Sequence, residues 1–400
     1  MDNIFKKRLI LSKIIEHIDH KNAIVVTGMR QVGKTTLMRS VFSKIESHPK
    51  LWFDFDNPLD QKMFEDIEYR NIYERLKKQS GAKDDERIFV FIDEIQNFPE
   101  ITKIMKVLID RWKVKFFVIG SSSFYLKNLF PESLSGRKFL YELSPLSFRE
   151  YLYFLDKISF EEAAGWNLEK ILEPGNISNF KRLESEYADF LTFGGFPEVC
   201  LTKDRETKKE VLKNIFASFF EKDLKILSDY KDIRELRDLI LLLVPRVGSV
   251  LDVTKIASEL GVNRVKIYEY LDFLQGTFFI KLIPKFSKSI DRAVAGGKRV
   301  YFSDTGILNA VGEVNEAQIF ENSVVNQLSN YGQVSFYRDR NGAEIDAVLD
   351  KKTALEIKLK GTDEYLKDLK KLSMVVGTKD YFLISRDYSK TSKVIFGSSL

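Results

Sequence analysis

Nine residues near the start of the chain combine glycines, a lysine and hydroxyls at a spacing that can hold a phosphate chain. They run from Gly28 to Thr36 (GMRQVGKTT), after a β-branched run, Ala23–Thr27, and before a segment whose apolar residues have helical spacing. In such a strand–loop–helix, backbone N–H groups and the positive end of the helix dipole face the β- and γ-phosphates. The pattern predicts a Walker A loop that binds ATP. The alternative is a glycine turn that binds nothing.

The side chains of this loop have separate expected roles. Lys34 would place a mobile positive charge on the outer phosphates, and the Thr35 hydroxyl would ligate Mg²⁺. The residues expected around the nucleotide are Gly28, Arg30, Gly33, Lys34, Thr35 and Thr36.

A continuous apolar strand, Ile88–Ile92, runs directly into Asp93 and Glu94, as in a Walker B strand. Asp93 would lie at the carboxyl end of the strand, where it can hold the water shell of Mg²⁺, and Glu94 can polarise the attacking water. On its own the acidic pair could cap a helix. Coupled to the Walker A loop, it predicts ATP hydrolysis with Mg²⁺ as a cofactor.

Two further features suit a nucleotide site. The strand Phe116–Ile119 precedes a serine cluster, in which Ser121 or Ser122 would hydrogen-bond the γ-phosphate or the water, unless the serines cap the next helix. The transition state also needs added positive charge from the same or a neighbouring subunit. Arg137 is the first candidate for this catalytic arginine and Arg149 the second, although either could be an ordinary surface arginine.

The last hundred residues hold a second group of charged side chains. Glu344 and Asp346 lie two apart on one expected strand, and Glu356 and Lys358 lie two apart on the next, so each pair shares a face. Residues 350–353 can turn the chain into a hairpin that brings these faces together. Asp346 and Glu356 would then form an oxygen site for one or two Mg²⁺ ions, with Lys358 orienting or deprotonating the attacking water. The alternative is a surface hairpin with solvated charges.

Between the two groups, Val253–Leu260 and Asn263–Gln275 read as two helices around a glycine turn. Two strand-like runs, Phe278–Pro284 and Lys298–Phe302, flank a basic segment, so the region resembles a winged helix. In a DNA-binding version the second helix enters the major groove by its N-terminal residues. Here these nucleic-acid contacts would be Asn263, Arg264 and Lys266. The alternative is a winged helix that only packs between domains.

Several ordered motifs together resemble one family. GMRQVGKTT, FIDEIQ, IGSSS, SLSGR followed by LSPLSFREY, and FLTFGGFPEV are similar to motifs of the archaeal-type AAA+ ATPases of bacteria and archaea, and they cover residues 20–200. The resemblance implies a nucleotide-dependent machine with a helical lid after the nucleotide core and a C-terminal domain of poorly defined role. Gly194–Glu198 (GGFPE) has no chemistry of its own and reads as a tight turn before a helix.

The C-terminal segment is similar to the PD-(D/E)XK, or restriction-endonuclease-like, phosphodiesterases, in their Holliday-junction-resolvase branch. The resemblance implies Glu321 as an acid on the preceding helix, Asp346 as the core metal ligand, and Glu356 and Lys358 as the rest of the site, with Glu344 beside it. No proline precedes the first acid, which departs from the fullest form of the motif. The fold also serves in inactive scaffolds, so the resemblance leaves cleavage open.

The length and composition of the chain are those of a soluble protein with more than one domain. A chain of 400 residues is too long for one core, and 44% hydrophobic with 30% charged residues is typical of a soluble protein. The net charge of +5 barely favours a nucleic-acid partner. The single cysteine, Cys200, excludes an internal disulfide and fits the cytoplasm. No apolar run approaches the roughly 20 residues of a membrane span, so we expect no membrane contact.

We therefore expect an α/β protein in four parts: a P-loop AAA+ core with a parallel sheet (1–154), a helical lid or linker (155–235), a winged helix (236–304) and an α/β restriction-endonuclease-like domain (305–400). It would couple ATP turnover to DNA binding or metal-dependent DNA cleavage. The main alternative is a nucleotide-dependent switch that acts on a protein partner, with an inert C-terminal scaffold. The sequence leaves the oligomeric state open.

Overall fold

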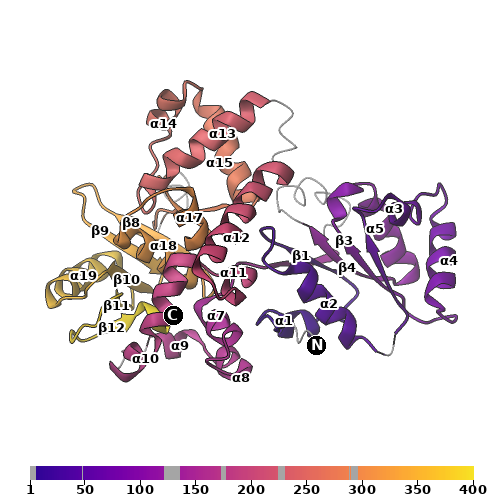
Figure 1. Ribbon diagram of the computed structural model, residues 1–400, viewed down its shortest axis with the longest axis horizontal. Helices are drawn as coiled ribbons and strands as arrows, with labels where there is room; N and C mark the ends of the chain where they lie inside the picture. The colour runs from indigo at the N-terminus through magenta and orange to yellow at the C-terminus, as the bar shows by residue number, and fades with distance from the viewer. Residues whose placement is uncertain are drawn as a thin grey trace. The chain divides into compact units, whose positions relative to one another are not determined.

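The computed structural model describes residues 6–46, 48–120, 136–172, 177–223, 230–287, 289 and 296–400. The chain divides into two compact units, coloured in chain order in Figure 1. Unit 1 is Met1–Ser144 with Gly276–Phe278, and unit 2 is Pro145–Gln275 with Phe279–Leu400. The finer division into four parts stays a prediction.

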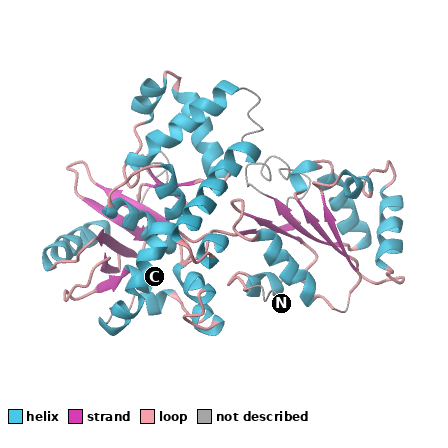
Figure 2. Cartoon of the chain, viewed as in Figure 1, coloured by secondary structure: helices cyan, strands magenta, loops and turns pink. Residues whose placement is uncertain are grey.

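Unit 1 is built on a parallel five-stranded sheet in the order β2-β3-β4-β1-β5 (Figure 2), which confirms the parallel sheet expected of a P-loop fold. Its strands are β1 (Ala23–Thr27), β2 (Lys50–Asp54), β3 (Phe89–Asp93), β4 (Lys115–Gly120) and β5 (Lys138–Glu142). Its described helices are α1 (Leu11–Ile15), α2 (Lys34–Lys44), α3 (Pro58–Lys62), α4 (Tyr69–Ser80), η1 (Ile95–Asn97) and α5 (Ile101–Trp112).

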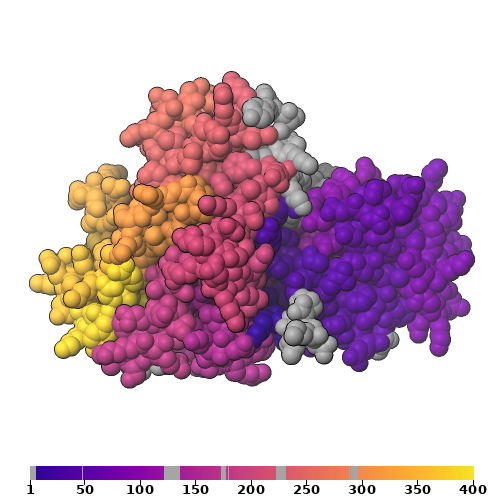
Figure 3. All heavy atoms as spheres, viewed as in Figure 1, coloured from indigo at the N-terminus to yellow at the C-terminus, as the bar shows by residue number. Residues whose placement is uncertain are grey.

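Alternate residues of the central strands pack on opposite faces of this sheet. Val90 and Phe116 join the core formed with α4 and α5. Phe91 and Phe117 lie on the other face, stacked at 4.3 Å, and Phe42 of α2 packs 5.0 Å from Phe91. Strands β1, β3 and β4 are buried at every position beneath the surface drawn in Figure 3. Such double covering is what a parallel sheet requires, and it explains why these strands read as unbroken apolar runs.

Unit 2 begins with helices and ends with a mixed sheet. Its first described helices are α7 (Phe148–Phe154), α8 (Phe160–Ala164), α9 (Leu168–Ile171), α10 (Ile177–Phe193), α11 (Pro197–Leu201), α12 (Arg205–Ser218) and η2 (Phe219–Asp223). They are followed by α13 (Tyr230–Leu243), η4 (Val244–Arg246), α14 (Val253–Leu260), α15 (Arg264–Gly276), β6 (Ile280–Pro284), β7 (Lys298–Phe302) and α17 (Thr305–Val311). The C-terminal elements are α18 (Glu316–Leu328), β8 (Val334–Arg338), β9 (Glu344–Leu349), β10 (Thr353–Lys358), α19 (Asp363–Val376), β11 (Asp380–Ser385), β12 (Val394–Phe396) and η5 (Gly397–Ser399).

The C-terminal sheet has the order β12-β11-β10-β9-β8. The expected hairpin is confirmed, because β9 pairs antiparallel with β10 in the register Val348 to Ala354. Strands β10, β11 and β12 run parallel, with α19 connecting the first two. The two strands predicted around the basic segment also pair, as the antiparallel β6–β7 hairpin. Much of the basic segment itself lies outside the described residues.

The GGFPE element is held by a buried carboxylate. Asp304 accepts hydrogen bonds from the N–H groups of Gly195 (2.7 Å) and of Ile307 at the start of α17 (3.1 Å). Gly194 has φ of 74°, and a Cβ there would lie 2.0 Å from Asp304 Oδ1. A Cβ on Gly195 would lie 2.3 Å from the carbonyl oxygen of Leu146. Both positions therefore require glycine. The motif packs against Leu146 and Asp304, which are far from it in the sequence.

Burial raises the pKa of the Asp304 carboxyl from 3.8 to about 6. Because the folded chain holds this proton more tightly than the unfolded chain, Asp304 favours folding most below about pH 4, and that contribution is lost as the pH rises through about 6. The unfolding free energy of the wild type should therefore fall relative to that of Asp304→Asn by about 2–3 kcal/mol between pH 4 and 7, measured by chemical denaturation. Relative to Asp252→Asn, a substitution at the exposed N-cap of α14, the unfolding free energy of the wild type should show no such fall. An equal fall relative to both variants would contradict the assignment to Asp304.

Candidate functional site

The predicted Walker A loop lies between the end of β1 and the start of α2. Gly28 has φ of 150°, and a Cβ there would lie 2.1 Å from the carbonyl oxygen of Leu143, so the chain can pass only without a side chain. Gly33, with φ of 93°, is the N-cap of α2. Lys34 is 8% exposed, and its Nζ donates to the carbonyl oxygens of Gly28 (2.9 Å) and Met29 (2.8 Å). The loop thus wraps around the ammonium group at the N-terminus of an 11-residue helix, the geometry that favours phosphate groups.

One hydrogen bond joins the two predicted motifs. The Thr35 hydroxyl donates to Asp93 Oδ2 at 2.8 Å. Burial raises the pKa of the Asp93 carboxyl, while the hydrogen bond from Thr35 acts in the opposite direction. A hydroxyl and a carboxylate held together are oxygen ligands of the kind that Mg²⁺ prefers, so Thr35 and Asp93 would hold a Mg²⁺, which would supply positive charge beside the phosphates.

Glu94 follows Asp93 in a conformation that is unusual for a side-chain-bearing residue. Its φ of 51° is left-handed, at a cost on the order of 1 kcal/mol, and its N–H donates to Asp93 Oδ1 at 2.9 Å. Its carboxylate accepts a hydrogen bond from Gln96 Nε2 and lies 4.0 Å from Arg30 Nη1. Arg30, predicted to contact nucleotide, thus reaches the proposed water-polarising group. Gln96 was not singled out as a site residue from the sequence, although it is the last residue of the FIDEIQ motif.

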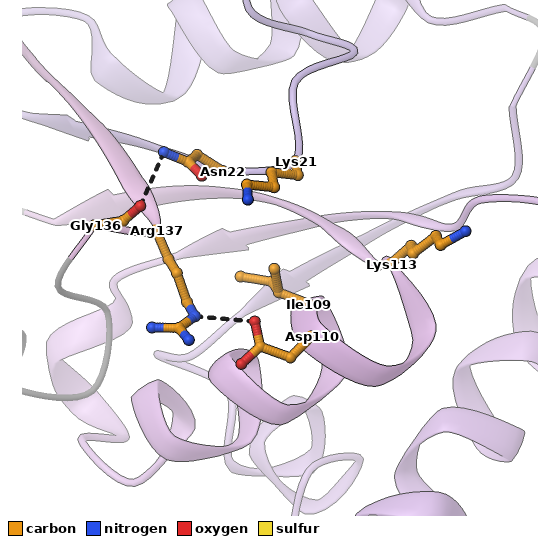
Figure 4. Close-up of a pocket in the computed structure, with 7 residues that line it drawn as sticks. All are labelled: Lys21, Asn22, Ile109, Asp110, Lys113, Gly136 and Arg137. Carbon is orange, nitrogen blue, oxygen red and sulfur yellow. Dashed lines mark hydrogen bonds and ion pairs between the residues drawn. The ribbon is translucent and has the colours of Figure 1, made fainter.

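Arg137 lies at the opposite edge of the sheet from the Walker A loop, because it precedes β5 whereas the loop follows β1. Its Nε donates to Asp110 Oδ1 at 2.9 Å across a hollow of about 540 Å³ (Figure 4). The hollow is lined by Lys21, Asn22, Ile109, Asp110, Lys113, Gly136 and Arg137. A five-residue strand spans roughly 16 Å, so Arg137 cannot reach the phosphates bound by its own chain. If Arg137 is the catalytic arginine expected from the sequence, it must therefore act on the nucleotide of a second copy.

Arg149 is not a surface arginine. It is 5% exposed in unit 2 and donates to the carbonyl oxygens of Leu400 (3.0 Å) and Ser399 (2.6 Å). Its guanidinium lies 3.2 Å from the ring centre of Trp166, and burial lowers its pKa to about 9. Arg149 therefore anchors the last described residues. Ser121 and Ser122, the expected γ-phosphate sensors, lie outside the described residues.

The structure brings the predicted C-terminal residues together. Lys358 Nζ lies 2.9 Å from Asp346 Oδ2 and 2.7 Å from Glu356 Oε1. The Ile357 N–H donates to the same Asp346 oxygen at 2.9 Å. The convergence expected of the two strand faces is therefore present.

Arg299 of β7 also enters this group, although no sequence motif identified it. It is 3% exposed and lies 2.9 Å from Glu344 Oε2, 3.5 Å from Glu321 Oε1 and 3.7 Å from Asp346 Oδ1. The Tyr301 hydroxyl donates to Glu321 at 2.7 Å. The residues that we call the carboxylate cluster are Arg299, Tyr301, Glu321, Glu344, Asp346, Glu356 and Lys358.

The carboxylate cluster does not fit the Mg²⁺ expected at Glu321, Asp346 and Glu356. Within the ranges that the structure describes, no three or more His, Cys, Asp or Glu side chains are grouped so as to hold an ion. Burial, together with the charge of Asp346, raises the pKa of both Glu321 and Glu356 above its usual range. The contacts favour internal ion pairs over the expected metal ligation.

The three expected nucleic-acid residues at the start of α15 have different environments. The Asn263 side chain accepts from the Lys266 N–H at 2.9 Å and thus begins the helix. Lys266 Nζ lies 2.7 Å from Asp232 Oδ1 and 2.6 Å from Glu235 Oε2, and these hydrogen bonds raise its pKa. Arg264 is exposed. The charge of Lys266 is therefore already paired on α13 and not directed toward a phosphate.

Family comparison agrees with the geometry of unit 1. Residues 20–152 match the family described as an AAA domain. This part of the chain has an AAA-type P-loop ATPase fold. Residues 184–318 and 316–392 match two domains of unknown function, DUF8612 and DUF4143. The AAA domain supports ATP binding and ATPase activity, whereas these further matches assign no chemistry to unit 2.

Relatives match most of the chain. An uncharacterized protein, MJ1544, of Methanocaldococcus jannaschii is 28% identical over 363 residues, 87% of this chain and 77% of that protein. An uncharacterized protein of Haemophilus influenzae is 25% identical over 355 residues, 85% of this chain and 82% of that protein. The Walker-type ATPase paby2304 of Pyrococcus abyssi aligns at 15% identity with a TM-score of 0.50, covering 78% of this chain and 96% of that one, which is a likeness of fold. No helix in the described ranges is long and apolar enough to cross a membrane.

The position of Glu94 predicts that a substitution there abolishes ATP hydrolysis but leaves ATP binding intact. Glu94→Gln should still bind ATP with Mg²⁺, because Lys34, Thr35 and Asp93 are unchanged, but should lose about 10²–10⁴-fold in turnover because the amide cannot accept a proton from water. Fluorescent-nucleotide titration and phosphate release measure the two properties. Glu100→Gln, an exposed neighbour, should leave both unchanged; hydrolysis by Glu94→Gln at the wild-type rate would exclude Glu94 as the base.

Proposed function

We propose that this protein binds ATP with Mg²⁺ and hydrolyses it. The observation that carries the proposal is the 2.8 Å hydrogen bond between Thr35 and Asp93, which joins the hydroxyl of one motif to the carboxylate of the other. Lys34 binds the outer phosphates, and Glu94 accepts the proton of the attacking water. A bound Mg²⁺ neutralises charge that develops on the phosphates.

For unit 2 we propose the role of a nucleotide-dependent switch that acts on a protein partner. Lys266 is committed to Asp232 and Glu235, and the oxygens of the carboxylate cluster are committed to Arg299 and Lys358, so both expected contacts with DNA are weakened. On the exposed side of α15, Val265 is 65% and Tyr268 57% exposed. An apolar and an aromatic side chain on one helix suit a protein partner better than a phosphate backbone.

Coupling of ATP turnover to DNA binding or cleavage is the competing function. The test compares the wild type with Lys34→Ala and Lys358→Ala in phosphate release, with and without DNA, and in cleavage of linear, supercoiled and branched DNA with Mg²⁺ or Mn²⁺. A switch predicts slow turnover that is indifferent to DNA and lost in Lys34→Ala, with no cleavage by any of the three proteins. Cleavage by the wild type that disappears in Lys358→Ala would establish a nuclease and overturn the switch.

We expect hydrolysis to need a second copy of the chain, because Arg137 and the nucleotide-binding loop of the same chain lie at opposite edges of the sheet. Turnover per chain should rise with protein concentration, and Arg137→Ala should lose about 10³-fold or more in turnover while still binding ATP. Arg111→Ala, an exposed arginine on α5, is the matched control and should retain turnover.

A mixture gives the sharper measurement. Glu94→Gln chains carry an intact Arg137, and Arg137→Ala chains carry an intact Glu94, so mixing two inactive proteins should restore part of the phosphate release. A monomeric mass with a rate independent of concentration, and no recovery on mixing, would exclude a role of Arg137 between copies.

A further inference from the structure

The buried charge of Arg299 is surrounded by acidic side chains from two different elements. Glu321 comes from α18, and Glu344 and Asp346 come from β9; all three lie within 3.7 Å of the guanidinium nitrogens. The guanidinium carbon lies 4.8 Å from the ring centre of Phe336 on β8, which covers one side of the group. Arg299 thus forms ion pairs with three carboxylates and also donates to the backbone carbonyl oxygen of Asp346 at 3.5 Å.

Lys358 is the second cation of the carboxylate cluster. It contacts one oxygen of Asp346 while Arg299 faces the other, and it also holds Glu356. Two cationic side chains therefore serve four carboxylates: Glu321, Glu344, Asp346 and Glu356. The summed charge of these two cations equals that of one divalent cation, and at least one oxygen of each carboxylate is already engaged by them.

The strand that carries Arg299 is held against the C-terminal sheet. Strand β7 pairs with β6 along its whole length, and just beyond β6 the Phe286 N–H donates to the carbonyl oxygen of Phe336 at 2.6 Å. Lys285 forms a parallel bridge with Phe336 at the same place. These backbone contacts keep the guanidinium among the acids, so Arg299 is a fixed part of the carboxylate cluster.

We propose that Arg299 takes the place of a divalent cation in the carboxylate cluster, so that the cluster binds no metal while Arg299 is present and becomes a Mg²⁺ or Mn²⁺ site when Arg299 is removed. Without Arg299, four clustered carboxylates face a single ammonium group. An uncompensated buried charge destabilises the fold strongly, and hard oxygen ligands of this kind take up Mg²⁺ or Mn²⁺. The proposal concerns unit 2 alone and does not depend on ATP hydrolysis.

The proposal is tested by measuring how Mn²⁺ changes the Tm of proteins with and without Arg299. All proteins carry Asp93→Asn, which removes a Mn²⁺ ligand from the nucleotide site, and are freed of metal with a chelator. Arg299→Met should lower the Tm by about 6 °C or more, and Mn²⁺ at millimolar concentration should recover most of that loss. The protein that retains Arg299 should show no Tm shift with Mn²⁺ and no stoichiometric Mn²⁺ binding by electron paramagnetic resonance. Arg299→Lys, which keeps a cation, should bind no Mn²⁺.

Three further variants make the outcome decisive. Arg338→Met removes a half-exposed arginine 4.0 Å from the same Glu344 and should give neither the loss nor the rescue. Adding Asp346→Asn to Arg299→Met should abolish the rescue. If Arg299→Met does not fold, Arg299→Met with Glu344→Gln removes a cation and an acid together and should bind Mn²⁺ through the remaining acids. Stoichiometric Mn²⁺ binding with Arg299 in place, or a folded Arg299-lacking variant that binds no Mn²⁺, would overturn the proposal.

Discussion

The nucleotide site depends on the parallel arrangement of β1, β4 and β3. Because all strands of the sheet run in one direction, the loop after β1 and the acidic residues after β3 emerge at the same edge, separated by one intervening strand. Two strand spacings amount to roughly 10 Å, which side chains from the first turn of α2 and the end of β3 can bridge. The hydrogen bond from Thr35 to Asp93 is this bridge, and the proposed ATPase site is built around it.

Three buried charges of unit 2 each have polar partners within the described residues. Asp304 receives backbone N–H groups, Arg149 donates to backbone carbonyl oxygens, and Arg299 faces carboxylates. An unpaired buried charge would cost far more free energy than any single packing contact supplies. The partners also join distant segments: Asp304 ties the end of α10 to the start of α17, and Arg299 ties β7 to β9 and α18. In unit 2 the charged residues therefore organise the fold.

The two acidic sites differ in what surrounds the carboxylates rather than in residue type. At the nucleotide site, Asp93 accepts hydrogen bonds from a neutral hydroxyl and from the backbone N–H of Glu94, and the adjacent Lys34 donates to carbonyl oxygens of its own loop. In the carboxylate cluster each acid has a cation from the same chain within 3.5 Å. A hydroxyl beside a carboxylate leaves room for an external cation, whereas an ammonium or a guanidinium supplies that charge itself. This difference makes the first site suited to ATP with Mg²⁺ and the second suited to holding strands together.

The sequence by itself determined the elements whose signals are local. A glycine loop between a strand and a helix, an apolar strand that ends in Asp-Glu, and acids spaced two apart on a hairpin all depend on neighbours in the chain, and Lys34, Thr35, Asp93, Asp346 and Lys358 were found in this way. Tertiary structure alone decided the partners that are distant in sequence. Arg299 lies 47 residues from Asp346 and has no motif, Lys266 is paired with α13, and Arg137 lies at the wrong edge of the sheet for its own nucleotide. Local pattern fixes which groups a segment presents; only the packing of segments against one another decides whether those groups meet a ligand or another side chain.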